Sequence, residues 1–184
     1  ADTVTAQIRS EARRYYELYA ALDPLKASPA ASGRPAVALL IRSLEERLTQ
    51  TLERLFRLLG LRYPPREIHT AYQAWARGRK ETLAAAIDFL DSVLDRDVKR
   101  VVLPLLDDAG RLLDSGFLRF GITLNKPEEA VLELSRERDT WLCMCAMAAA
   151  PELQIEKARG ELRKLEQSGY PESARVAEWA LARY

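Results

Sequence analysis

Two cysteines and two methionines lie close together in residues 139–153, whose sequence is DTWLCMCAMAAAPEL. Thiolates and thioethers are soft ligands, so a Cys-x-Cys pair beside methionine raises the hypothesis of a metal or redox site. On a helix, however, residues two apart point about 200° away from each other. Cys143 and Cys145 therefore cannot share one ion if this segment is helical. We interpret the stretch as one side of a packed helix, in which each cysteine acts as a small hydrophobic residue.

Other residues that could carry chemistry lack the partners that such chemistry needs. The chain has one histidine, His69. A catalytic or ligating histidine needs an orienting partner, and Glu67, two residues away, lies on a different helical face. Asp88 and Asp91 are three residues apart and could share a cation only weakly. The phosphate-binding, zinc-protease and serine-hydrolase motifs are absent from the sequence. We therefore predict no catalytic, cofactor-binding or metal-binding residue, and no enzyme activity.

The composition predicts an all-helical protein. The chain has 184 residues, 48% of them hydrophobic, which is enough to bury a core. Leucine, alanine, glutamate and arginine dominate, glycine is rare, and no stretch alternates in the manner of a strand. The 28 basic and 27 acidic residues give a net charge of +1, which does not favour a dedicated nucleic-acid binder. No run of about 18 apolar residues is present, so we expect no transmembrane helix in this segment.

The spacing of apolar residues places the elements. The strongest signal is a stripe from Val37 to Leu59, which predicts a long helix that ends at Gly60. A first helix is expected over 3–22, ending at Asp23–Pro24, and a flexible connector over 26–35. Further helices are expected over 65–78, 79–94, 95–106 with a break at Pro104, 127–136, 139–150, 152–167 and 171–183. Residues 107–126 show no regular pattern and are expected to form an irregular insertion.

Short antiparallel helices joined by tight turns suggest a repeat architecture. Ala86, Ala146 and Ala177 are each followed, three and four residues on, by small or apolar residues, and the intervals of 60 and 31 residues fit two repeats and one. A small residue at a fixed position lets neighbouring helix pairs approach closely. We therefore predict that residues 1–184 form a single helical-repeat domain, a short α-solenoid of antiparallel helix pairs.

The chain resembles the HEAT-repeat class. The segments DTWLCMCAMAAA and YPESARVAEWALARY, at residues 139–150 and 170–184, are similar to second helices of such repeats. That class usually has an Asp-Pro opening with an arginine five residues on. Here Thr140 replaces the proline in one segment, Tyr170 replaces the aspartate in the other, and the arginine positions hold Cys143 and Ala174. Polar residues that this class usually has at these positions are therefore partly missing from the chain.

A narrower resemblance involves residues 52–75, 84–108 and the segment that begins FGITLNKPEEAVLEL at residue 120. In this order they resemble the HEAT-type domain of bacterial membrane proteins related to major-facilitator and ATP/ADP carriers, which often also carry a cyclic-nucleotide-binding domain. The resemblance implies a non-enzymatic accessory or regulatory module, excised from a longer chain, cytoplasmic, and tethered to the inner membrane through the part not included. The implied partners are the parent membrane domain, a sister domain or another protein.

The helix over 139–150 also offers a candidate interaction surface. Leu142, Cys145 and Ala149 mark a broad face that should pack inside the protein. Trp141, Met144 and Ala148 fall together on the other side, which would be polar on an ordinary surface helix. We predict that these three residues meet another helix or a binding partner.

The alternative function is nucleic-acid recognition, because alkylpurine DNA glycosylases are built from HEAT-like repeats with a basic, aromatic-lined concave face. Such a face needs several unpaired basic residues on one side. In the long helix, Arg42, Arg54 and Arg57 alternate with Glu46 and Glu53, which is typical of a solvent-exposed face linked by salt bridges. We therefore expect no nucleic-acid partner.

Overall fold

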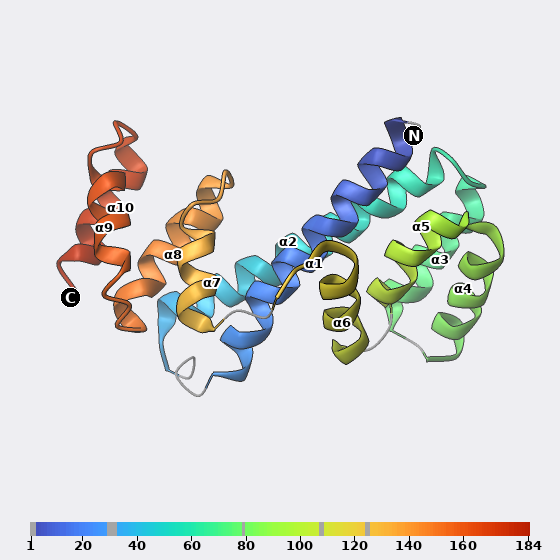
Figure 1. The fold of residues 1–184 in the computed structure, drawn as a ribbon, viewed down its shortest axis with the longest axis horizontal. Coiled ribbons are helices and arrows are strands. Elements are labelled where there is room, and N and C mark those ends of the chain that lie inside the picture. Colours follow the sequence, from blue (N-terminus) through green and yellow to red (C-terminus); the bar gives the residue numbers. More distant parts are fainter. Residues whose placement is uncertain (1–2, 29–32, 79, 107–108, 124–125) are drawn as a thin grey trace. The chain divides into compact units, whose positions relative to one another are not determined.

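The computed structural model describes residues 3–28, 33–78, 80–106, 109–123 and 126–184 (Figure 1). Across these ranges helices are the only regular secondary structure and no strand is present, which confirms the predicted all-α class. The chain divides into two compact units. Unit 1 comprises Ala1–Leu18 and Arg47–Thr123, and unit 2 comprises Tyr19–Glu46 and Leu124–Tyr184.

The first two helices are long, and the division between the units passes through both. Helix α1 covers Thr3–Ala27 and helix α2 covers Pro35–Gly60. The predicted end of α1 at Asp23–Pro24 is wrong, because the helix continues through Pro24 for another turn. Leu25 in that turn is completely buried, and its packing offsets the hydrogen bond that proline cannot make.

The predicted connector, residues 26–35, overlaps both helices. Lys26 and Ala27 belong to α1, Pro35 begins α2, and residues 29–32 lie outside the described part of the chain. The predicted apolar stripe of α2 is confirmed, since the following residues are fully buried: Val37, Leu40, Leu44, Leu52, Leu55 and Leu59.

Unit 1 contains α3 (Pro65–Arg77), α4 (Lys80–Val93), α5 (Arg96–Val102), the short 3-10 helix η2 (Leu103–Leu106) and α6 (Ala109–Phe120). Helix α3 packs against α4, and η2 contacts α4, α5 and α6. Gly78 ends α3 in the left-handed conformation, with φ of 66°, as its position in the sequence predicts. The expected interruption at Pro104 is also present, because α5 gives way to η2 one residue earlier.

The segment 107–126, expected to be irregular, contains the helix α6 instead. The prediction failed because Gly116 weakens the helical pattern, although here it serves close packing. A Cβ atom at Gly116 would lie 3.0 Å from Cδ1 of Tyr16, which is 2% exposed. The ring of Tyr16 also meets Phe120 at 5.5 Å between centroids, and its hydroxyl donates to the Val101 carbonyl at 3.3 Å. Tyr16 therefore joins α1, α5 and α6.

A polar cluster fastens the turns of unit 1. Oδ2 of Asp95, just before α5, accepts hydrogen bonds from Nε and Nη2 of Arg62 at 3.1 and 2.7 Å and from the Tyr63 hydroxyl at 2.9 Å. Arg62 also donates to Thr5 of α1. Because two neighbouring residues of the loop after α2 donate to one carboxylate, Asp95 fixes that loop against the start of α5.

Unit 2 contains α7 (Pro127–Leu134), α8 (Thr140–Glu152), α9 (Ala158–Glu166) and α10 (Pro171–Leu181). Helix α8 packs against α7, α9 and α10, and α9 packs against α10. Asp139 caps α8, because its Oδ1 accepts the backbone N–H groups of Trp141 and Leu142 at 3.1 and 3.3 Å.

The predicted boundary between the helices over 139–150 and 152–167 is displaced. Helix α8 extends through Pro151 to Glu152, and α9 begins only at Ala158. Proline in the last turn prevents further extension, and Gln154, with φ of 56°, turns the chain. The intervening Ile155 is buried, so residues 153–157 form a packed turn in place of the first turn of a helix.

None of the described helices is both long enough and apolar enough to cross a membrane.

Candidate functional site

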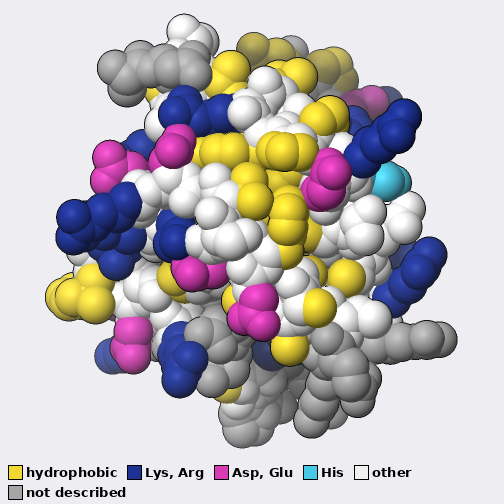
Figure 2. All heavy atoms as spheres, turned by 90° about the vertical axis from the view of Figure 1, so that its right-hand side faces the viewer, with side chains coloured by type: hydrophobic (Ala, Val, Ile, Leu, Met, Phe, Trp, Pro, Cys, Tyr) yellow, Lys and Arg dark blue, Asp and Glu magenta, His cyan; other side chains and the backbone are white. Residues whose placement is uncertain are grey.

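A concave surface of unit 1 lies between α3 and α4 and has a volume of about 440 Å³. Figure 2 looks onto this side of the molecule and shows apolar side chains gathered in a band with charged side chains on both sides. The apolar lining of the groove consists of Ala71, Ala74, Ala85, Ala86 and Phe89. Four alanines on two adjacent helices leave room that larger side chains would fill, so the groove follows directly from the residue types.

The two ends of the α3–α4 groove carry opposite charges. Glu67, in the first turn of α3, and Arg77, in its last turn, both line the groove and are exposed. Neither side chain has an ion-pair partner among the described residues. Ten residues of helix separate them, which corresponds to roughly 15 Å along the axis. The site is therefore an apolar groove with an acid at one end and a base at the other.

A second, smaller groove of about 360 Å³ runs along the opposite flank of α3, beside the last turns of α2. Its lining includes Phe56, Tyr72 and His69. Phe56 and Tyr72 are in contact, with 5.4 Å between ring centroids, and Tyr72 stacks on Trp75 at 6.3 Å. Glu53 and Arg57, which line the same groove, satisfy each other in an ion pair of 2.5 Å. This groove thus offers fewer free charges than the one between α3 and α4.

The three residues predicted as an interaction surface are Trp141, Met144 and Ala148 of α8, and Trp141 contacts α2. Trp141 is 45% exposed, whereas Met144 and Ala148 are half-buried. The indole Nε1–H of Trp141 donates to Oγ of Ser43 at 2.9 Å. At the other end of α8, Glu152 binds the first turn of α2. Part of this surface therefore meets another helix of unit 2, and part of it faces solvent.

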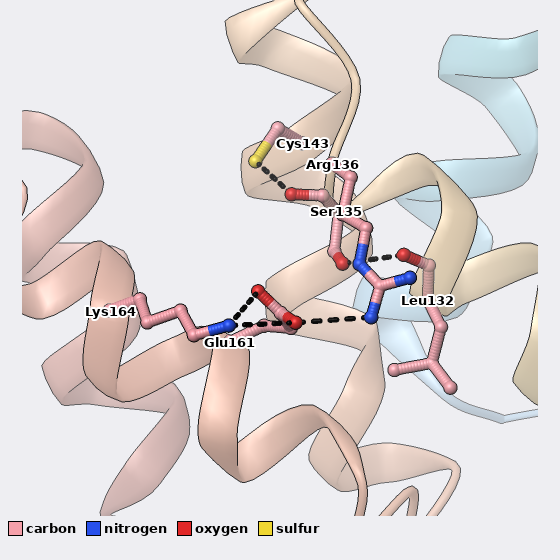
Figure 3. A network of polar contacts seen from close by, with 6 residues as sticks. All are labelled: Leu132, Ser135, Arg136, Cys143, Glu161 and Lys164. Carbon is pink, nitrogen blue, oxygen red and sulfur yellow. Dashed lines mark hydrogen bonds and ion pairs between the residues drawn. The ribbon is translucent and has the colours of Figure 1, made fainter.

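The two cysteines are both buried and form no disulfide. The Sγ–H of Cys143 donates to the carbonyl of Ser135 at 3.0 Å, as Figure 3 shows. Burial raises the pKa of the Cys143 thiol above its ordinary value. Sγ of Cys145 instead faces Ser43, 3.7 Å from its Oγ. The thiols thus contact different segments, which agrees with the interpretation of the stretch as a packed helix.

Figure 3 also shows the ion pairs that surround this end of unit 2. Glu161 of α9 binds Arg136 at 3.1 Å and Lys164 at 3.3 Å. Arg136, and secondarily Lys164, lower the pKa of the Glu161 carboxyl. The Arg136 pair links α9 to the turn after α7, so this carboxylate has a structural role in the packing of successive helix pairs.

The remaining candidates for chemistry are dispersed. His69 is exposed and its Nε2 lies 2.8 Å from the side-chain amide of Gln73. Asp91 forms an ion pair with Lys99 at 3.1 Å, so it does not act with Asp88 as a pair of free carboxylates. In the described ranges, no three histidine, cysteine or acidic side chains gather closely enough to hold a metal ion.

The arginines of α2 are paired with acids, as predicted for a salt-bridged exposed face. Arg42 binds Glu46 at 3.2 Å and Arg57 binds Glu53. Arg54 forms its ion pair outside its own helix, with Glu11 of α1, at 3.2 Å. These contacts neutralise the positive charges that a phosphate-binding face would need to keep available.

Helix α10 presents a distinct stripe at the surface of unit 2. The stripe consists of Glu172, Val176 and Trp179 of α10 and of Arg183, two residues beyond its end, at spacings of four, three and four residues. Trp179 is 40% exposed, and the guanidinium of Arg183 lies 3.6 Å from the centre of its ring. Glu172, in the first turn of α10, is exposed and has no ion-pair partner in the described part of the chain.

The α3–α4 groove was missed in the sequence because alanine is ambiguous. Ala86 was predicted to lie where neighbouring helices pack closely, and it is 6% exposed. Ala85 and Ala74 beside it remain accessible. The available signal was the pair of alanines on each of two consecutive helices, with Glu67 and Arg77 at the ends of the first. Whether such alanines are covered by a third helix depends on tertiary packing, which helical periodicity does not report.

Comparisons of the chain with known protein families, with curated proteins and with solved structures found no match.

Proposed function

We propose that this chain is a non-enzymatic helical interaction module that binds a helical segment of a protein in the groove between α3 and α4. The observation that carries the proposal is the groove itself: about 440 Å³ of space with an apolar lining and, at each end, one charge that has no ion-pair partner among the described residues. A surface of this kind suits an amphipathic helix, whose apolar side chains fill the space between the alanines. The charged ends then set the direction in which the helix lies.

We further propose that the architecture is a short HEAT-like α-solenoid. Support comes from unit 2, where α7 packs on α8, α9 packs on α10, and α8 also contacts α10. Consecutive antiparallel pairs joined through one helix of each pair are the building principle of such arrays. In unit 1, α3 and α4 form a comparable sequential pair.

The resemblance noted in the sequence leads to a proposal about the parent protein. The module would be the cytoplasmic accessory domain of a nucleotide-transporter-like membrane protein of bacteria, and its partner the membrane domain, a sister domain or another protein. Sequencing the complete gene tests this part, because a hydrophobic multi-helix region is expected upstream of residue 1. A gene that encodes only this helical segment would contradict it.

Site-specific photo-cross-linking tests the binding function. A photoreactive amino acid is placed at Gln73, which lines the groove, and the full-length gene product is irradiated in the cells that make it. We expect cross-links to a defined helical segment of protein, mapped by mass spectrometry. The matched control carries the same group at Asp114, an exposed position of α6 outside the groove, and should give no such product.

Two outcomes would contradict the proposal. If both positions yield the same scattered products, the groove is not a specific binding surface. If the Gln73 product is a nucleic-acid adduct, the alternative function is favoured, namely a HEAT-like nucleic-acid-binding protein or an alkylpurine DNA glycosylase.

A further inference from the structure

The charges of the α3–α4 groove have a counterpart elsewhere in the same chain. Along α3, the order from N- to C-terminus is acid then base, Glu67 and Arg77. Along the exposed stripe of α10 the order is also acid then base, Glu172 and Arg183. If two such helices lie antiparallel, each acid meets a base. Antiparallel packing is also the orientation that helix dipoles favour.

The spacings of the two charge pairs agree. Glu67 and Arg77 are ten residues apart in α3, and Glu172 and Arg183 are eleven apart, with Arg183 two residues beyond the end of α10. At the rise of a helix these separations correspond to roughly 15 and 16 Å. A helix laid along the groove can therefore satisfy both ends at once. A mismatch of one turn, about 5 Å, would leave one of the two pairs open.

The apolar parts are complementary as well. Between its two charges the groove offers a floor of small residues, including Ala71, Ala74 and Ala86. Between its two charges α10 offers one large side chain, Trp179, and the half-buried Val176. A protruding tryptophan placed over alanines is the pairing of large and small residues that close packing requires.

We propose that the groove between α3 and α4 binds α10 of a second copy of this chain, antiparallel to α3. In this arrangement Glu172 of the second copy pairs with Arg77 and Trp179 lies over the alanines. Arg183 leaves its contacts with the ring and the carbonyl of Trp179 and pairs with Glu67. This inference rests on the proposed function, because it names the occupant of the same groove.

The contact joins two different surfaces, so it is heterologous. Each copy keeps one free groove and one free α10, and association therefore continues head to tail until a ring closes or a filament grows. This property separates the proposal from a symmetric dimer, in which both copies would use the same surface.

A mixing experiment tests this directly. Arg77→Glu disables the groove and leaves α10 intact, whereas Trp179→Ala disables α10 and leaves the groove intact. The unmodified chain is expected to gain mass as its concentration rises from about 1 to about 100 μM, and each variant alone to remain largely monomeric at concentrations at which the unmodified chain already associates. An equimolar mixture should form a complex of twice the monomer mass that grows no further, measured by light scattering after size exclusion.

Charge exchange provides a second, independent readout. Arg77→Glu and Glu172→Arg should each raise the dissociation constant about tenfold or more, because like charges then face each other. The double variant, in which the pair is inverted, should recover most of the affinity. Arg96→Glu and Glu178→Arg are the matched controls, since both residues are exposed and neither belongs to the groove or to the α10 stripe. Circular dichroism establishes that every variant folds.

The outcomes separate the two proposals. An unmodified chain that stays monomeric over the whole range overturns this inference, and cross-links from Gln73 to a different protein would then leave the binding function standing. Self-association that persists in both single variants also overturns it, because another surface is responsible. Self-association abolished by each variant and restored by mixing supports it.

Discussion

Gly116 lies directly against the ring of Tyr16, so closely that a Cβ atom at this position would be 3.0 Å from Cδ1 of the ring. Tyr16 is held from other directions by Phe120 and by its hydrogen bond to Val101, and burial raises the pKa of its hydroxyl. The ring therefore has little freedom to move away. In unit 1, a residue without a side chain is what allows α6 to approach α1.

Gly116→Ala should destabilise the protein even though alanine is the better helix former. The gain in helix propensity is about 1 kcal/mol, whereas overpacking against a fixed ring costs about 1–3 kcal/mol. Gly160→Ala in α9 is the matched control, because no atom lies within 4 Å of the added methyl group. Urea unfolding should show a lower midpoint for the first variant and a higher one for the second. Equal effects of the two substitutions would mean that Tyr16 gives way.

Glu152 caps a helix that is far away in the sequence. Its Oε2 accepts the backbone N–H groups of Ala36 and Val37, both at 3.0 Å, in the first turn of α2. These donors have no partner within their own helix, and Arg34, just before α2, offers no acceptor side chain. The carboxylate at the end of α8 thus supplies the cap that the local sequence lacks.

Glu152→Ala should lower the free energy of unfolding by about 1–2 kcal/mol, since it leaves two backbone donors without a partner and removes a negative charge from a helix N-terminus. Glu152→Gln keeps one acceptor oxygen and should cost less than Glu152→Ala. Chemical denaturation measures both. Glu178→Ala, at an exposed position of α10, is the control and should change stability by no more than about 0.5 kcal/mol. If Glu152→Ala behaves like the control, the cap contributes nothing.

These contacts explain which features were predictable from the sequence. The stripe of α2 was predicted because leucines at intervals of three and four report burial directly. Helix α6 was missed because glycine is read as a helix breaker, and only the neighbouring Tyr16 reveals its packing role. The cap by Glu152 joins residues 115 apart or more, and no local pattern records such a contact.

The candidate sites show the same limit. Trp141 was noticed because a large aromatic on a second apolar face of one helix is a local signal. The α3–α4 groove escaped notice because it belongs to two helices at once, and its alanines look identical whether they are covered or open. Local periodicity indicates which face of a helix is apolar, but tertiary packing decides whether that face is occupied.

The Asp95 cluster should make stability depend on pH in the acid range. Hydrogen bonds from Arg62, and then from Tyr63, lower the pKa of the Asp95 carboxyl in the folded protein. A carboxyl with a depressed folded pKa contributes its full stabilisation above its ordinary pKa, near 4, and loses it as the pH falls through the lower folded value. The unmodified protein should therefore lose this contribution below about pH 4.

Asp95→Asn should remove that part of the pH dependence. Asparagine can accept only one of the hydrogen bonds well and carries no charge for Arg62. Unfolding midpoints measured between about pH 7 and pH 3 should differ most between the two proteins at neutral pH and converge as the pH falls. Asp114→Asn, at an exposed position of α6, serves as the control. Its unfolding midpoints should change with pH in parallel with those of the unmodified protein. Parallel curves for Asp95→Asn would show that the cluster is too solvent-exposed to matter.

The hydrogen bond between Trp141 and Ser43 decides how firmly the exposed indole is held. Ser43 is 3% exposed, and its Oγ accepts the indole N–H while also facing Sγ of Cys145. Trp141→Phe keeps an aromatic ring without the donor, and Ser43→Ala removes the acceptor. A double-mutant cycle of these two changes should give a coupling energy of about 0.5–1.5 kcal/mol, because the bond is partly shielded from water. A coupling near zero would mean that the indole is free to leave α2, and that Trp141, Met144 and Ala148 are more available to a partner than the structure indicates.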